Sequence, residues 1–315
     1  MNKPQIISAS RRTDIPAFYS TWLVNRLRAG WVLTYNPFNR RPVQVSLRPA
    51  EVAGIVLWSK NFGPLIPHLP EIEARGYRLY FIFTITGLPR VFEPGVVAPE
   101  EALAHFKLLA QRYSPEHVQW RYDPIILTSL TDPAYHRETF RTLCQELEGH
   151  TRRCYFSFAT LYPKVRRRLQ ALAAREGFQW WPEPPLEDKR QLATELAAIA
   201  ARHGIELFSC CDELLVGERI KKAHCIDATI LAPLFDLDPG LYRPKPTRPQ
   251  CGCDESVDIG TYDTCLHLCA YCYANADAKR VLANRRRHDP SLPALPGPEY
   301  VEGQGPNPMS TEPNT

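Results

Sequence analysis

Three cysteines near the carboxyl end of the chain have a spacing that suits metal–sulfur chemistry. They form the pattern Cys265-x3-Cys269-x2-Cys272, which places three thiols on one short loop. A [4Fe–4S] cluster normally takes four Cys ligands, one on each iron. A loop of this length reaches three irons more easily than four, so the pattern predicts a cluster with one open iron. The alternative is a zinc site, although zinc usually takes its cysteines as two separated pairs.

Four other cysteines could form a second site. Cys251 and Cys253 flank a glycine, Cys211 follows a predicted strand, and Cys225 precedes a proline-rich stretch. Four thiols are a complete ligand set for a second [4Fe–4S] cluster or for zinc. The sequence favours the second cluster, with zinc as the alternative. One of the adjacent pair Cys210 and Cys211 can instead pack inward, because neighbouring strand residues point to opposite faces.

The loop from Cys265 to Cys272 resembles that of the radical S-adenosylmethionine (SAM) enzymes. Those enzymes carry Cys-x3-Cys-x2-Cys with an aromatic residue before the last Cys, and Tyr271 occupies that position. The resemblance implies that SAM binds the open iron and that an electron from the cluster cleaves it to a 5′-deoxyadenosyl radical, which acts on an unknown substrate. It also implies an electron donor such as flavodoxin or ferredoxin. Where Gly is expected in this loop the chain has Leu268, which suits a negative φ.

Two longer stretches are similar to a bacterial family. Ser8-x-Ser-Arg-Arg-Thr-Asp-Ile-Pro16 and the run from Cys251 to Cys265 resemble the domain-of-unknown-function family 1848, over about residues 5–280. That family is recognised for a carboxyl-terminal cysteine cluster similar to the amino-terminal cluster of radical SAM enzymes, and its activity is uncharacterised. The resemblance therefore implies an iron–sulfur cluster without implying a substrate.

Apolar stretches alternate with helical patterns along the first two thirds of the chain. We predict six strands, at residues 5–9, 54–58, 78–84, 117–123, 154–158 and 205–209. Residues 32–35 and 43–47 predict an added hairpin. Strands that alternate with helices of 10–18 residues are typical of successive βα units and a parallel sheet.

Polar residues follow each predicted strand directly. In β/α barrels the chemistry lies on the face where the strands end, whereas an open doubly wound sheet has one crevice at its switch point. The pattern therefore predicts an α/β fold, an incomplete (β/α)6 TIM-like barrel, which is also the fold that the radical SAM resemblance implies. The alternative is that these residues are polar only because loops are polar.

Seven of these polar residues are candidate site residues. The expected catalytic residues are Arg121 and Asp123, for which a structural ion pair is the alternative because they lie on one strand face. The residues expected to bind SAM are Arg12, Asp14, Lys60, Asp212 and Glu213. An Arg can hold a carboxylate through two hydrogen bonds, and an acidic residue can hold ribose hydroxyls.

The chain divides into three predicted parts. Residues 1–213 form the partial barrel, and residues 214–288 form a cysteine-rich metal-binding segment packed on it. Residues 289–315 are rich in Pro and Gly with hardly any apolar side chains, which predicts a disordered tail.

Composition limits the function classes. The chain has 38 Lys and Arg against 34 Asp and Glu, a net charge of +4 that is weak evidence for nucleic-acid binding, although a nucleic-acid partner is not excluded. Neither a signal peptide nor a membrane span is evident, so we expect no membrane partner and a cytoplasmic location, where clustered cysteines bind metals more often than they form disulfides.

Three functions compete at this stage. The first is a radical SAM-like enzyme acting on a small-molecule or other unknown substrate. The second is an iron–sulfur electron-transfer or redox-sensing protein, in which a fourth cysteine would complete the cluster of the Cys265 loop. The third is a zinc-stabilised nucleic-acid-binding protein. The run Arg285–Arg287 could contact a phosphate backbone, but the sequence favours a solvated basic helix end. Polar residues at six strand ends favour a small-molecule pocket and argue against the third function.

Overall fold

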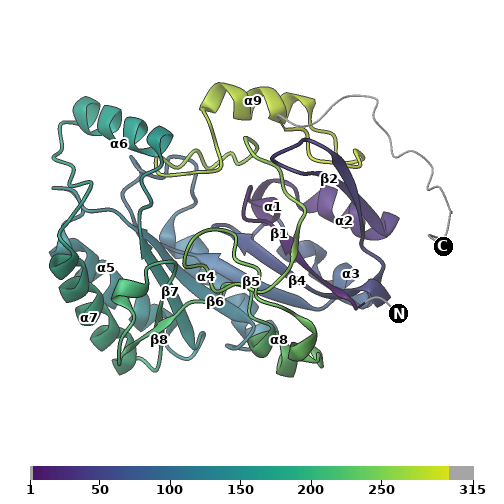
Figure 1. The fold of residues 1–315 in the computed structure, drawn as a ribbon, viewed down its shortest axis with the longest axis horizontal. Coiled ribbons are helices and arrows are strands. Elements are labelled where there is room, and N and C mark those ends of the chain that lie inside the picture. Colours follow the sequence, from purple (N-terminus) through teal and green to yellow (C-terminus); the bar gives the residue numbers. More distant parts are fainter. Residues whose placement is uncertain (1–2, 298–315) are drawn as a thin grey trace.

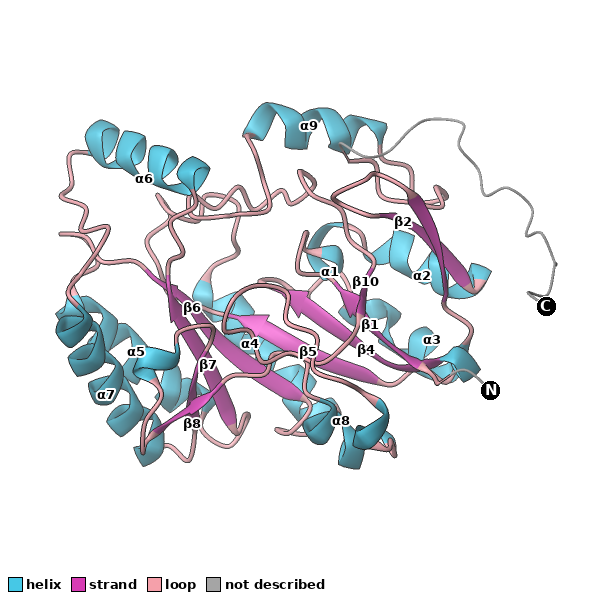
Figure 2. Ribbon diagram, viewed as in Figure 1, coloured by secondary structure: helices cyan, strands magenta, loops and turns pink. Residues whose placement is uncertain are grey.

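A parallel sheet of eight strands forms the centre of this mixed α/β fold, in a computed structural model that describes residues 3–297 (Figures 1 and 2). The strand order is β10-β1-β4-β5-β6-β7-β8-β9. The strands are β1 (Gln5–Ala9), β4 (Val52–Ser59), β5 (Leu79–Thr84), β6 (Val118–Ile125), β7 (Arg153–Phe158), β8 (Glu206–Ser209), β9 (Ile220–Lys222) and β10 (Val257–Asp258).

The six predicted strands are confirmed, and they lie side by side in sequence order. A doubly wound sheet would reverse its order at a switch point, and this sheet does not. Every pairing in it is parallel, so the carboxyl ends of all strands share one edge. Over residues 3–297, no ladder of hydrogen bonds joins β9 to β10.

One face of the sheet is covered by helices. These are α2 (Ser20–Ala29), α3 (Leu69–Ala74), α4 (Pro99–Arg112), α5 (Pro133–Leu147) and α7 (Leu186–Arg202), with the short α1 (Ile15–Phe18) beside β4. Phe106 stacks on Phe83 and Phe140 stacks on Trp120, and Trp22 is fully buried in the same cluster. This is the main hydrophobic core, and it fixes the positions of the strand ends.

The opposite face is covered by the segment that follows β9. We call it the inner face; its sheet side chains include Ile6, Val56, Tyr80, Ile82, Tyr155 and Phe208. Helix α8 (Ala228–Phe235) packs Leu231 and Phe235 on it, and the green segment crosses the strands in Figure 1. A Cβ on Gly54 would lie 2.5 Å from the Phe235 ring, so glycine is needed for this close packing.

Two further elements lie over the carboxyl ends of the strands. Helix α6 (Pro163–Glu176) packs Val165, Leu169 and Leu172 against Leu88 and Phe92 rather than joining the main helical layer. Helix α9 (Ala278–Arg287) lies on the same side of the molecule, along the top of Figure 1. The predicted hairpin is confirmed as β2 (Trp31–Tyr35) paired antiparallel with β3 (Pro42–Ser46).

The predicted disordered tail begins too early in the chain. Residues 289–297 are packed, with Ala294 and Leu295 buried. The Leu33 amide donates to the Pro293 carbonyl over 2.8 Å, and the Trp22 indole donates to the Leu292 carbonyl. Two apolar side chains and these backbone acceptors are enough to order an extended proline-rich stretch. The remainder of the predicted tail lies outside the described residues.

A histidine in the core makes folding sensitive to acid. His136 on α5 is buried between the Tyr122 hydroxyl at 2.7 Å and the Ile126 carbonyl at 3.0 Å. Burial lowers the pKa of His136 from 6.5 to about 4. Below pH 6.5 the unfolded chain therefore binds a proton that the folded chain does not, so the contribution of this residue is present above pH 6.5 and is lost as pH falls towards 4.

We expect His136 to lower the free energy of unfolding by about 2 kcal/mol between pH 7 and pH 5. Urea unfolding at both pH values measures it. His136→Gln should flatten the pH dependence by that amount, whereas His150→Gln, near the surface, should leave it unchanged. An unaltered slope in His136→Gln would contradict the assignment.

Candidate functional site

The loop from Cys265 to Cys272, called the cysteine loop below, lies over the carboxyl ends of β1 and β4. The buried His267 ring places Nε2 at 2.7 Å from the Asp14 carboxylate and Nδ1 at 2.9 Å from the Gly95 carbonyl. Asp14, which follows β1, also accepts hydrogen bonds from the Ser59 hydroxyl and the Lys60 amide at the end of β4. One histidine thus attaches the loop to two neighbouring strand ends.

Glu93 provides a second attachment, at the end of β5. Its carboxylate accepts hydrogen bonds from Lys60 at 2.9 Å, from the Thr86 hydroxyl at 2.8 Å and from the Tyr271 hydroxyl. Burial lowers the pKa of Lys60, but the Glu93 carboxylate and the other negative groups nearby outweigh burial and raise it above 10.5. The aromatic residue of the cysteine motif is therefore held by a buried ion pair.

The loop and the segment around Gly95 touch through their backbones. The Gly95 amide donates to the His267 carbonyl over 3.0 Å, and a Cβ on Gly95 would lie 2.7 Å from the Leu266 carbonyl oxygen. Only glycine permits this approach. Leu268 has φ of 54°, so the expectation of a negative φ there is wrong: this position has the left-handed conformation that glycine adopts more readily.

The three thiols of the loop share one buried environment. Cys269 is buried and Cys265 and Cys272 are half-buried. Burial, followed by the charges of Cys272, Asp14 and Cys269, raises the pKa of the Cys265 thiol. Burial and the charge of Glu93 likewise raise the pKa of Cys269, partly offset by Lys60. Thiols in such surroundings stay protonated unless a metal displaces their protons.

Five other cysteines form a second group, which we call the five-thiol ring. Cys210 Sγ lies 3.9 Å from Cys211 Sγ and 3.6 Å from Cys225 Sγ. Cys251 interacts with Cys211 and Cys253, and Cys253 interacts with Cys225, which closes the ring. The ring lies on the inner face, where the end of β8 meets the segment before β10. Cys211, Cys225, Cys251 and Cys253 were predicted to meet, and Cys210 joins them.

Arginines surround the five-thiol ring. Arg121 donates to Cys225 Sγ over 2.8 Å, and Arg248 donates to Cys211 Sγ over 2.9 Å. Hydrogen bonds from Cys211 and Cys225, together with the charges of the two arginines, lower the pKa of Cys210. Cys251 also has a lowered pKa, through hydrogen bonds from Cys211 and Cys253, whereas the hydrogen bonds to Cys210 raise the pKa of Cys211 and Cys225. The ring therefore favours thiolates at Cys210 and Cys251, and a metal would have to displace the protons of the other thiols.

The predicted catalytic pair lies between the two cysteine groups. Arg121 and Asp123 form an ion pair at 2.5 Å, so the structural alternative describes their contact. Arg121 faces the five-thiol ring, while Asp123 also contributes to raising the pKa of Lys60 beside the cysteine loop. A row of charges from Lys60 through Asp123 to Arg121 thus connects the two groups.

The residues predicted to bind SAM are divided by the fold. Asp14 and Lys60 hold the cysteine loop, and Arg12 lies nearby, donating to the Gly260 carbonyl at 3.3 Å. Asp212 and Glu213 lie at the far edge of the sheet, where Glu213 forms an exposed ion pair with Lys222. The structure does not bring these two acidic residues to the cysteine loop.

Several functional candidates were missed by sequence reasoning. Cys210 was seen only as the neighbour of Cys211, and Glu93, His267, Arg248 and Asp258 carry no local signal. Asp258 accepts from the hydroxyls of Ser8 and Ser10 and from the Arg11 amide, and thereby fastens β10 to β1. All of these contacts join residues far apart in sequence.

Two buried donors point to a ligand between the cysteine groups. The Arg11 guanidinium and the Arg121 guanidinium lie 5.0 and 5.6 Å from the Trp58 ring. Arg11 Nη2 and Trp58 Nε1 are buried and have no hydrogen-bond acceptor within the described part of the chain. Buried donors usually have a partner, so an acceptor-rich ligand such as a carboxylate fits here.

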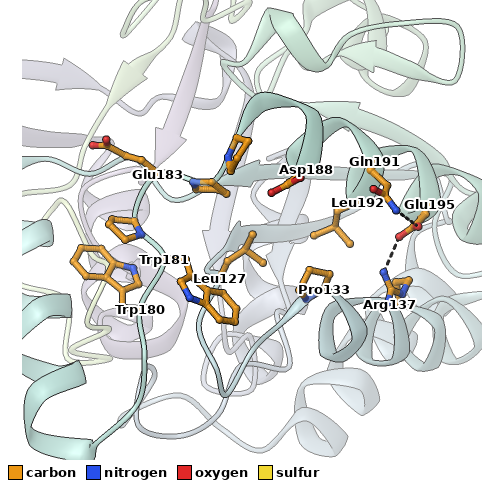
Figure 3. A pocket seen from close by; sticks show the side chains of 13 residues that line it. Leu127, Pro133, Arg137, Trp180, Trp181, Glu183, Asp188, Gln191, Leu192 and Glu195 are labelled. Carbon is orange, nitrogen blue, oxygen red and sulfur yellow. Dashed lines mark hydrogen bonds and ion pairs between the residues drawn. The ribbon is translucent and has the colours of Figure 1, made fainter.

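Two of the cavities among residues 3–297 differ in their distance from the cysteine groups. A small one of about 200 Å³ is lined by Lys60, Thr86 and Glu93, next to the cysteine loop. A larger one of about 640 Å³ lies between α5, α7 and the segment Trp180–Pro185, with Arg137 paired to Glu195 on its wall (Figure 3). No cysteine lines the larger cavity.

Both cysteine groups fit a metal by donor type rather than by preformed geometry. Thiolates are the ligands that iron–sulfur clusters and zinc prefer. Among residues 3–297, no three His, Cys, Asp or Glu side chains already converge as a metal-binding group. Metal binding would therefore require rotation of the cysteine side chains.

Comparisons with known proteins give little functional information. No curated protein matches the chain. A solved structure from a study of the pneumococcal virulence factor StrH, and of N-glycan recognition and hydrolysis, shares 9% sequence identity with a TM-score of 0.27. The alignment covers 70% of this chain and 59% of that one. A likeness this weak carries no argument about fold or function.

None of the described helices is both long enough and apolar enough to span a membrane.

The family comparison is informative. The family model described as "Domain of unknown function (DUF1848)" matches residues 6–274, from β1 to the end of the cysteine loop. The match includes all ten cysteines. The chain therefore belongs to the DUF1848 family.

Proposed function

We propose that this protein is a radical SAM-type enzyme, with a [4Fe–4S] cluster held by Cys265, Cys269 and Cys272. The observation that carries the proposal is the position of the cysteine loop. It follows β1 by about 250 residues, yet His267 and Tyr271 fix it over the ends of β1, β4 and β5. The carboxyl ends of the strands are where β/α folds carry their chemistry.

The distribution of the cysteines supports an open iron. Five of the ten cysteines form the five-thiol ring, and Cys144 and Cys154 are buried in the helix-covered core. All ten lie within the described residues, so a fourth cysteine does not join the loop. This favours the enzyme over an electron-transfer protein with a fully ligated cluster. When bound, such a cluster supplies the electron that cleaves SAM to a 5′-deoxyadenosyl radical.

The surrounding residues have defined tasks in this proposal. Asp14 and Glu93 hold the loop through His267 and Tyr271. The buried donors of Arg11 and Trp58 are suited to the SAM carboxylate. The consecutive order of β1, β4, β5, β6, β7 and β8 supports an incomplete β/α barrel for this enzyme, with residues of the segment 223–253 packed on the inner face.

We further propose that the five-thiol ring holds a second metal centre. Tetrahedral zinc with Zn–S bonds of about 2.3 Å separates its sulfurs by about 3.8 Å. The Cys210 separations of 3.6 and 3.9 Å match this spacing. The ligands of a cubane sit on different irons and lie further apart. The cysteine side chains must rotate to bind either metal, and these two short separations require less rotation for zinc than for a second [4Fe–4S] cluster. We therefore propose zinc, with Arg121 and Arg248 as outer hydrogen-bond donors.

The test is anaerobic reconstitution followed by reduction with dithionite in the presence of SAM. We expect 5′-deoxyadenosine, together with about four irons and about one zinc per chain. About eight irons without zinc would assign a second cluster to the ring. If iron binds but SAM is not cleaved and does not change the EPR signal of the reduced cluster, the enzyme proposal fails and an electron-transfer or redox-sensing role replaces it.

A further inference from the structure

Positive charge is concentrated on the two helices over the strand ends. Helices α6 and α9 each carry five Lys or Arg residues, and between them they have one acidic residue, Glu176. Their combined charge is +9, so the rest of the chain, whose total is +4, carries −5. Three of those negative charges, Glu299, Glu302 and Glu312, lie outside the described residues, so the rest of the described chain carries −2. The positive charge of the described chain is thus concentrated on these two helices, which we call the basic rim.

This basic rim borders the cysteine loop on two sides. On α6, Arg168 donates to the Cys272 carbonyl. On α9, Asn284 donates to the Asp263 carbonyl over 2.9 Å, just before the loop begins. In Figure 1 the yellow-green chain that contains the loop runs between the two helices. Arg167 on α6 and all five basic residues of α9 are exposed.

Two exposed aromatic rings lie on the same surface. Tyr162 precedes α6 and is 38% exposed, and Tyr273 follows Cys272 and is 41% exposed. Their ring centres are 6.2 Å apart, and the Tyr273 hydroxyl is fixed by a hydrogen bond to the Arg11 carbonyl. Exposed rings beside basic side chains are the kind of arrangement on which unpaired bases stack.

We propose that α6, α9 and the pair Tyr162 and Tyr273 form a binding surface for single-stranded nucleic acid. This nucleic acid is then the substrate class of the enzyme proposed above. The binding itself does not depend on that enzyme proposal; only the role of the nucleic acid as substrate rests on it. The basic side chains suit the phosphate backbone, and the tyrosines suit bases. An anionic membrane would match the charge but not the paired rings held beside the loop.

Fluorescence anisotropy of the intact reconstituted protein with labelled 20-nucleotide single strands of DNA and of RNA tests the proposal. We expect salt-dependent binding to at least one of them, and the two arms identify which. Polyglutamate should compete poorly, and vesicles containing phosphatidylglycerol should bind more weakly than the oligonucleotide. Equal competition by polyglutamate, or tighter binding to the vesicles, would overturn the proposal.

Matched double variants show whether the positive charge of this surface, rather than positive charge elsewhere on the protein, contributes to binding. The double variant Arg167→Ala/Arg286→Ala should make the slope of log binding constant against log salt concentration shallower by about 1.4. Each contact with a single-strand phosphate contributes about 0.7 to this slope. The control Arg202→Ala/Arg219→Ala removes the same charge where α7 ends and β9 begins, at the other edge of the sheet, and should not alter the slope. Equal effects of the two double variants would reduce the surface to non-specific charge and overturn the proposal.

Substitutions of Tyr162 and Tyr273 test whether bases stack on these two rings. Tyr162→Ala and Tyr273→Ala should each weaken binding by about tenfold, whereas the Phe variants, which keep the ring, should bind normally. Loss in the Phe variants equal to that in the Ala variants would contradict stacking. SAM cleavage is read separately: cleavage without oligonucleotide binding ends this inference alone, and binding without cleavage ends the enzyme proposal alone.

Discussion

Cys269→Ala is expected to remove the iron of the cysteine loop and abolish 5′-deoxyadenosine formation, while the zinc of the five-thiol ring remains. Cys269 is the most enclosed of the three loop thiols and lies against Lys60 and Glu93. Two remaining thiols cannot hold a cubane that already lacks a fourth cysteine. Iron content should fall from about four per chain to below one, and SAM cleavage to the background level.

A variant in the five-thiol ring should remove the other metal, the zinc, and keep the iron of the cysteine loop. Cys210→Ala/Cys225→Ala leaves three thiols in the ring, so it should reduce zinc; it should leave the loop iron in place, because the two groups use different thiols. Cys144→Ala is the control for loss of a buried thiol: it should leave both metals in place and lower the free energy of unfolding by only about 1 kcal/mol. Retention of full iron and SAM cleavage in Cys269→Ala would show that the cysteine loop is not the cluster site.

The strands could be predicted because their apolar runs are long and bounded by helices. The predicted strand at 78–84 and the observed β5, Leu79–Thr84, differ by one residue. The helix of α4 could be predicted from Pro99 at its start and its apolar stripe. These signals lie within about 15 residues of chain, so they do not depend on knowing the tertiary structure.

The shortest elements could not be predicted in the same way. Strand β9 has three residues, two of them Lys, and β10 has two residues, so neither shows an alternating pattern. Helix α8 contains Pro233 and lies in a stretch whose prolines predict a linker. Contact with the sheet, rather than local preference, decides the structure of these segments.

The cysteine loop has a clear signal in the sequence, but its surroundings do not. Spacing alone identified Cys265, Cys269 and Cys272 as a group. The partners that hold the loop, Asp14 and Glu93, precede His267 and Tyr271 by 253 and 178 residues. A contact over that distance leaves no periodic signal, so only the fold reveals it.

The two cysteine groups are electrostatically connected. Asp123 forms an ion pair with Arg121, which lies beside the five-thiol ring. Asp123 also favours the charged form of Lys60, which lies beside the cysteine loop. A change in the charge of either cysteine group would therefore change the electrostatic potential at the other group through this carboxylate. The observed contacts of Asp123 are thus those of a charge placed between the two groups, and the catalytic role expected from its place at a strand end stays a prediction.

Glu93→Gln is expected to have the largest effect on stability of any single charge removal near the loop. Lys60 and Glu93 are both buried, and their ion pair spans 2.9 Å. Removing one partner of a buried pair leaves the other charge uncompensated and lowers the free energy of unfolding by about 3–5 kcal/mol. Urea unfolding at pH 7 measures the change. The exposed pair of Arg112 and Glu73 provides the control, since Glu73→Gln should lower it by less than about 1 kcal/mol.

A double-mutant cycle with Lys60→Met identifies the cause. If the ion pair carries the effect, the double variant Lys60→Met/Glu93→Gln should be more stable than the sum of the single changes predicts. The pH dependence has a defined sign. Because Glu93 raises the folded pKa of Lys60 above 10.5, the contribution of the pair is complete below pH 10.5 and is lost as pH rises further. Additive single changes would instead assign the loss to the hydrogen bonds of Thr86 and Tyr271, and would make Glu93 an anchor of the cysteine loop rather than the counterion of Lys60.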